Sequence, residues 1–146
     1  MKQLIIILIL TSILFLSGCL NPVAVSVVED TYEAALMKND ALVESYFSKD
    51  FLAEHPIEEL SDELAEDVRN REGTKLMNFK EHGEGHLNPE VIQALNEKYN
   101  NEWNFVVAQT SDATIMIWIV IKGERLYSIV DGKEVDVNTY LEDILK

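Results

Sequence analysis

Apolar and polar residues follow three different patterns along the chain. The first is an apolar run from residue 4 to residue 16, interrupted only by Thr11 and Ser12. From 23 to 71, apolar residues recur every three or four positions, which predicts amphipathic helices. From 103 to 130 they alternate with polar residues or run without a break, which predicts strands. The pattern therefore predicts a short apolar leader, then helices, then mostly sheet.

The helical part divides into three predicted helices at 23–38, 41–48 and 56–71. Asp40 is the expected N-cap of the second helix, and Pro56 is the expected first residue of the third. The third helix has an apolar stripe and an acidic outer face, which carries Asp62, Glu63, Glu66 and Asp67. We expect that face to be solvated, although a divalent cation or a basic partner surface would relieve its like-charge repulsion.

The second half of the chain predicts a sheet with two further helices. Strands are expected at 75–82, 103–110, 114–121 and 125–130, and the last three are joined by connections short enough for antiparallel hairpins. A helix is expected at 89–99, with Asn88 as its N-cap. Asp131-Gly132 predicts a tight turn before a short edge strand at 134–137, and Asn138 is expected to cap a final helix that ends at Lys146. This order of elements predicts an α+β domain, with N-terminal helices packed on a curved antiparallel sheet.

The strand at 114–121 is apolar on both faces. The first interpretation is a central strand that is covered on both sides by the protein itself. The alternative is a partly open sheet face that binds a ligand or a protein through aromatic anchors. In that case the candidate partner-binding residues are Trp103, Met116 and Trp118.

The apolar leader ends in a motif that indicates export and lipidation. Lys2 precedes the run, which has the length of a signal-peptide core and is too short to span a membrane. The tetrapeptide Leu16-Ser17-Gly18-Cys19 at its end resembles the lipobox of bacterial lipoproteins, in which a diacylglycerol is attached to the cysteine before the signal peptide is removed. We therefore expect a lipoprotein signal peptide at 1–18, a lipidated Cys19 with a short tether to residue 22, and a single domain at 23–146.

The single cysteine and the short tether after it predict where the domain lies relative to the membrane. Cys19 is the only cysteine, so the chain has no partner for an internal disulfide. Two acyl chains on one residue give stable attachment to a bilayer. Three residues span about 10 Å when extended, so the domain is expected on the outer face of the cell membrane, close to the lipid.

Charge narrows the range of partners. Removal of residues 1–18 takes away one basic residue, Lys2, and leaves 11 basic and 26 acidic residues, a net charge of −15. Nucleic acid is excluded as a partner, because its binding requires a basic surface. Repulsion from anionic headgroups leaves the lipid as the only strong membrane contact. A membrane or surface protein is the expected partner.

Two groups of residues suggest further chemistry. The segment 81–86 holds two histidines and two carboxylates, and His82, Glu84 and His86 are weak candidate metal ligands. Its two glycines favour a flexible loop over a metal site, so no cofactor is expected. The residues available for acid/base catalysis are Tyr32, Tyr46, Asp112 and Asp131, but none has a partner at a recognisable spacing. We therefore expect a protein that is not an enzyme.

A family resemblance adds to this interpretation. The segment 32–40 leading into Tyr46-Phe47-Ser48, the strands around Trp118, and the tail from Ile129 to Val135 before a closing helix resemble the cystatin-like-fold lipoproteins of Gram-positive bacteria. Their shape is related to that of nuclear-transport-factor-2-like domains. The helix at 89–99 departs from that pattern. This shape hosts enzymes, small-molecule pockets and interaction domains, so the resemblance alone does not select a function. It implies relatives that include exclusion lipoproteins, which act on conjugation machinery. The lipid anchor, the short tether and the absence of a catalytic set favour a non-catalytic interaction module of this kind, and a surface lipoprotein that binds a small ligand or a metal is the alternative.

Overall fold

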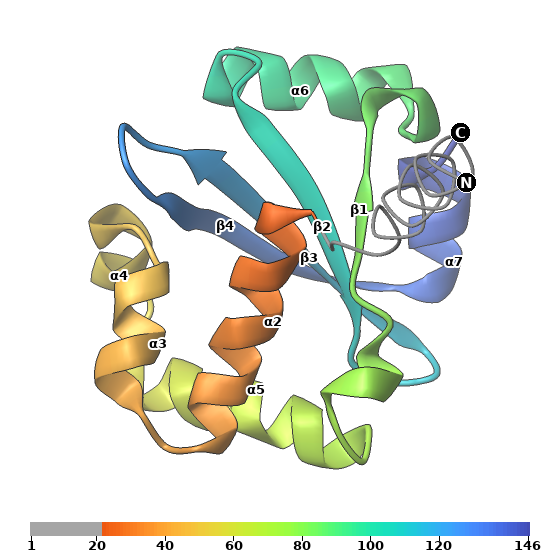
Figure 1. Cartoon of the computed structure of the whole chain (residues 1–146). Coiled ribbons are helices and arrows are strands. Elements are labelled where there is room, and N and C mark those ends of the chain that lie inside the picture. The colour runs from red at the N-terminus through yellow and green to blue at the C-terminus, as the bar shows by residue number, and fades with distance from the viewer. Residues whose placement is uncertain (1–21) are drawn as a thin grey trace, which may run out of the picture.

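The computed structural model describes residues 22–146, which form a four-stranded antiparallel sheet with helices on both of its faces (Figure 1). The α+β class predicted from the sequence is confirmed. The predicted signal peptide and the lipobox with Cys19 lie outside the described residues.

Four helices cover one face of the sheet: α2 (Val23–Leu36), α3 (Asp40–Tyr46), α4 (Lys49–Glu54) and α5 (Ile57–Asn70). The prediction that Asp40 caps the second helix is wrong, because the Asn39 side chain accepts the hydrogen bond from the Leu42 amide. Helix α4 was not predicted, and its N-cap is Ser48, whose hydroxyl accepts from the Phe51 amide. Pro56 stands just before α5 rather than inside it.

The strands follow one another across the sheet in chain order: β1 (Lys80–His82), β2 (Trp103–Gln109), β3 (Thr114–Lys122) and β4 (Tyr127–Asp136). The predicted strand at 75–82 is wrong in its first half, where residues 74–77 form a 3₁₀ turn. Asn78 then takes a left-handed conformation, with φ of 49°. That conformation breaks an extended chain, so pairing with β2 begins only at Lys80.

The predicted turn at Asp131-Gly132 is also wrong. Both residues lie inside β4, where Asp131 pairs with Ile119 and Gly132 pairs with Trp118. The pairing skips Val130, so β4 carries a bulge at this point. The bulge joins the two strands predicted separately at 125–130 and 134–137 into one.

Strand β3 lies between two apolar layers. Its side chains Trp118 and Val120 pack with α2 to α5 on one face of the sheet. Ile115, Ile117 and Ile119 pack on the other face with residues of the helices that follow β1 and β4. The closed, doubly covered strand is therefore the interpretation that is confirmed.

The second face of the sheet is covered by α6 (Pro89–Tyr99) and by a C-terminal segment of α7 (Val137–Thr139) and a π-helix (Tyr140–Ile144). Asn88 caps α6 as predicted, and its side chain accepts from the Glu90 amide. The prediction that Asn138 caps the final helix is wrong, because Asp136 accepts from both the amide and the hydroxyl of Thr139.

Candidate binding cleft

Of the three residues that were predicted to bind a partner, Met116 and Trp118 lie in the same apolar layer, whereas Trp103 lies in the layer on the other face of the sheet. Trp118 is only 1 % exposed, and its indole N–H donates to the Tyr32 hydroxyl at 3.2 Å. Trp103 and Met116 are half-buried, and the Trp103 indole donates to Asn96. The sheet is therefore closed at Trp118, so this residue is not an exposed aromatic anchor.

The histidine segment is divided between the core and the surface. His82 is 4 % exposed, and its Nε2 is hydrogen-bonded to the Tyr140 hydroxyl, whereas Glu84 and His86 are exposed on a 3₁₀ turn. Burial, with smaller contributions from Lys80 and His86, lowers the pKa of His82. Within residues 22–146, no group of three or more histidine, cysteine or acidic residues is arranged to hold a metal ion.

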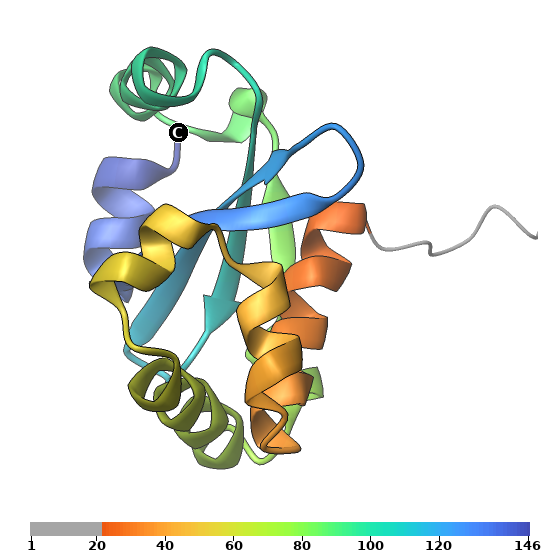
Figure 2. The ribbon, with the colours of Figure 1, turned by 90° about the vertical axis from the view of Figure 1, so that its left-hand side faces the viewer.

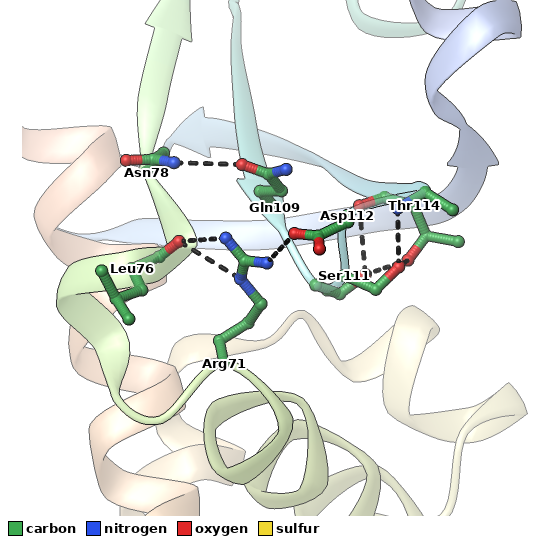
Figure 3. A network of polar contacts seen from close by, with 9 residues as sticks. Arg71, Leu76, Asn78, Gln109, Ser111, Asp112 and Thr114 are labelled. Atoms are coloured by element: carbon green, nitrogen blue, oxygen red, sulfur yellow. Dashed lines mark hydrogen bonds and ion pairs between the residues drawn. The ribbon is translucent and has the colours of Figure 1, made fainter.

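The residues considered for acid/base catalysis do not converge. Asp112 accepts from Arg71 at 2.7 Å, while the Arg71 guanidinium also donates twice to the Leu76 carbonyl (Figure 3). Asp131 lies near α6, where it accepts from Lys98 at 2.6 Å and from Tyr99 at 2.7 Å. Both aspartates therefore serve as partners in pairs that join separate elements.

A cleft of about 430 Å³ lies between α4, α5 and the adjoining parts of β3 and β4. Figure 2 views the domain from the side of α4, and the start of α2 lies away from α4 in this view as it does in Figure 1. The cleft has an acidic rim, formed by Glu63, Glu66, Asp67 and Glu134, and an apolar floor, formed mainly by Phe51, Leu60, Leu64, Met116 and Trp118. No residue that lines the cleft in the described part of the chain is a lysine or an arginine.

The pKa of Asp67, one of the four carboxyl groups of the rim, is shifted upward. Burial raises its pKa to about 6, and the charges of Glu134, Glu63 and Glu66 add to this effect. A hydrogen bond from Tyr32 acts in the opposite direction. Asp67 is thus half-buried among like charges, which is an unfavourable environment for an anion.

Close packing of the floor depends on Gly132. A Cβ atom at this position would lie 2.3 Å and 2.7 Å from two ring carbons of Trp118 and 3.0 Å from the Met116 methyl. The indole therefore lies directly against the backbone of β4. On its other sides it meets Tyr32, Phe47 and Phe51 through edge contacts, with ring centroids 5.8 to 6.3 Å apart. The floor is a fixed aromatic cluster.

The wall at α4 adds one more titratable group. The His55 ring stacks on Phe51, with the two centroids 4.0 Å apart, and its Nδ1 lies 2.9 Å from the Phe51 carbonyl oxygen. His55 is the C-cap of α4 and Pro56 is the N-cap of α5, so the chain turns from α4 into α5 at this corner. The cleft thus combines four carboxylates and one imidazole above a surface of aromatic and aliphatic carbon.

Sequence analysis placed Asp67 on the solvated outer face of its helix, and that placement is wrong. The residue lies seven positions after Leu60 and three after Leu64, so helical periodicity puts it at the edge of the apolar stripe. This spacing is the signal that identifies Asp67. No sequence pattern indicated that Glu134 lies at the cleft, because its position depends on the pairing of β4 with β3.

Comparison with family models, with curated proteins and with solved structures finds no match to this chain. Among residues 22–146, no helix has the length and apolar character needed to cross a bilayer.

Proposed function

We propose that this protein is a lipid-anchored binding module on the outer face of the cell membrane. In this proposal a diacylglycerol on Cys19 holds the domain at the bilayer, and the domain binds a membrane or surface protein without catalysing a reaction. The observation that carries the proposal is the position of the only cysteine. It ends the motif Leu16-Ser17-Gly18-Cys19 after an apolar run, four residues before α2 begins at Val23.

The arrangement of the domain supports a more specific assignment to the cystatin-like or nuclear-transport-factor-2-like shape. Helix α2 packs against an antiparallel sheet whose last strand is bent by a bulge, and the cleft lies beside that bulge. Helix α6, between β1 and β2, departs from the plain pattern. We propose this shape for the domain, and with it an interaction role such as exclusion at a conjugation apparatus.

The anchor is tested by metabolic labelling with a palmitate analogue, followed by fractionation of cells that express the full chain. We expect label on the wild type and none on Cys19→Ala, which accumulates as a precursor with its signal peptide or leaves the membrane. Ser17→Ala keeps a small residue at the cleavage site and is the matched control, with normal labelling expected. Normal processing and retention of Cys19→Ala would refute the anchor.

The binding role is tested by crosslinking on intact cells that express the lipidated protein, with Cys19→Ala as the control. Mass spectrometry is expected to identify one integral membrane protein that is enriched only with the anchored form. If the anchored protein and the control capture the same background, a small ligand or a metal becomes the better interpretation.

A further inference from the structure

We propose that the cleft between α4, α5 and the bulged end of the sheet receives a lysine or arginine side chain from a basic segment of the partner protein. This inference rests on the proposed function, because it specifies the chemistry of the partner that the anchored module would bind. It concerns a site that is separate from Cys19.

The charge of the cleft is the first argument. Glu63, Glu66, Asp67 and Glu134 line it, and none of them takes part in an ion pair among the described residues. The two ion pairs of the described domain lie elsewhere, at Arg71–Asp112 and Lys98–Asp131. A cation from outside would relieve the repulsion among four carboxylates that the protein's own basic residues leave uncompensated.

The form of the cleft is the second argument, because it distinguishes a side chain from a simple ion. A volume of about 430 Å³ over an apolar floor is much larger than a metal ion requires. Within residues 22–146, no three or more histidine, cysteine or acidic side chains are arranged closely enough to hold a metal ion. Lysine and arginine combine an aliphatic stem with a charged end, so the stem would cover Leu60 and Met116 while the charge meets the rim.

The depth of Asp67 defines the innermost part of the site. Asp67 is half-buried, whereas Glu63, Glu66 and Glu134 are exposed. A cationic group that enters past the exposed rim would meet Asp67 last. Asp67 is therefore the contact whose loss should weaken binding most, with Glu134 next because it faces Asp67 from the sheet.

The cleft is also placed where a partner can reach it. Helix α4, which forms one wall, lies away from the first residues of α2 in both views of the fold (Figures 1 and 2). In the proposed lipoprotein the anchor would join the domain at the start of α2, so the attachment point would lie away from this wall of the cleft.

The test uses the full chain, purified in an uncharged detergent, and a capped Gly-Arg-Gly peptide as the probe. Two-dimensional NMR at physiological salt is expected to show saturable shifts confined to the amides of the cleft, on α5, β3 and β4. Asp67→Asn combined with Glu134→Gln should weaken binding at least tenfold. The matched control, Glu142→Gln with Asp143→Asn, removes the same charge from the exposed C-terminal segment and should change affinity less than twofold.

Two further arms keep the proposal falsifiable. If the first variant fails to fold, Glu63→Gln with Glu66→Gln provides the test in its place. It changes only exposed residues of the rim and should also weaken binding of the peptide. A capped Gly-citrulline-Gly peptide has nearly the same shape without the charge and should not bind. The proposal is overturned if the shifts scatter over the acidic surface, if the control pair weakens binding equally, or if the citrulline peptide binds as well.

The result of the peptide-binding test does not depend on whether Cys19 carries a lipid. Palmitate labelling reports on Cys19 alone, and peptide binding reports on the cleft alone. Loss of the anchor with a functional cleft would remove the proposed location and leave the binding chemistry, and the opposite result would remove only the basic partner.

Discussion

Gly132 offers the most direct test of how the cleft floor is built. Substitution by alanine adds one methyl group in β4, at a point where the Trp118 ring already occupies the space. The added Cβ would lie 2.3 Å from one ring carbon, so something must move. The indole cannot shift freely, because Trp118 is only 1 % exposed and its N–H donates to the Tyr32 hydroxyl at 3.2 Å.

The magnitude follows from the cost of overpacking a core. Insertion of one methylene into a well-packed interior costs about 1–3 kcal/mol, and the two shortest contacts here favour a value of about 2 kcal/mol or more. Replacement of Trp118 by phenylalanine removes the part of the ring that meets Gly132. The double variant should therefore lose clearly less stability than the sum of the two single variants.

Urea unfolding followed by circular dichroism measures these differences. Gly83→Ala is the matched control, because Gly83 has an ordinary extended backbone and, apart from its chain neighbours, no atom of residues 22–146 lies within 4 Å of the added Cβ. It should change stability by less than about 0.5 kcal/mol or stabilise slightly. A Gly132→Ala variant as stable as Gly83→Ala would refute this account of the floor, as would strict additivity with Trp118→Phe.

Two other predictions concern buried polar groups. The folded-state pKa of Asp67, about 6, lies above its ordinary value of 3.8, so the folded protein binds this proton more tightly and loses stability as pH rises through that interval. After allowance for the exposure of Asp67, Asp67→Asn should therefore stabilise the protein by about 1 kcal/mol at pH 8. At pH 4 the substitution should change stability by almost nothing. Equal urea midpoints for variant and wild type at pH 8 would contradict this prediction. Tyr140→Phe should destabilise by about 1–3 kcal/mol in the same assay, because it removes the one hydrogen-bond partner that the buried His82 ring has among residues 22–146. A loss below about 0.5 kcal/mol would show that the bond contributes little.

Local sequence signals predicted the elements that depend on near neighbours in the chain. The apolar stripe Leu60, Leu64 and Val68 is buried as expected, Asn88 caps α6, and β2 and β3 lie within one residue of their predicted bounds. Each of these features is determined by periodicity, by a capping side chain or by a short hairpin connection. Such interactions are readable from a few adjacent residues.

The errors occurred where contacts from distant residues decide the conformation. The pair Asp131-Gly132 is typical of a turn. In the structure, however, the absence of a side chain at Gly132 lets Trp118 lie against the backbone of β4, and no local pattern predicts that contact. Residues 77–80 alternate like a strand, but 74–77 form a 3₁₀ turn in which Met77 is buried. The cleft itself was not predicted, because it combines α4, α5, β3 and β4, and only Asp67 carried a local signal for its position.

The order of the strands has a consequence for how the chain acquires this structure. In the described sheet every strand pairs with its neighbour in sequence, and the pairing of β2, β3 and β4 requires only short loop closures, whereas α6 lies between β1 and β2. Helix α2 is the exception, since Tyr32 bonds to Trp118, 86 positions further along the chain. Helices α3 and α5 also pack on α2, but the part of α2 that meets β3 stays uncovered during synthesis until Trp118 has been made.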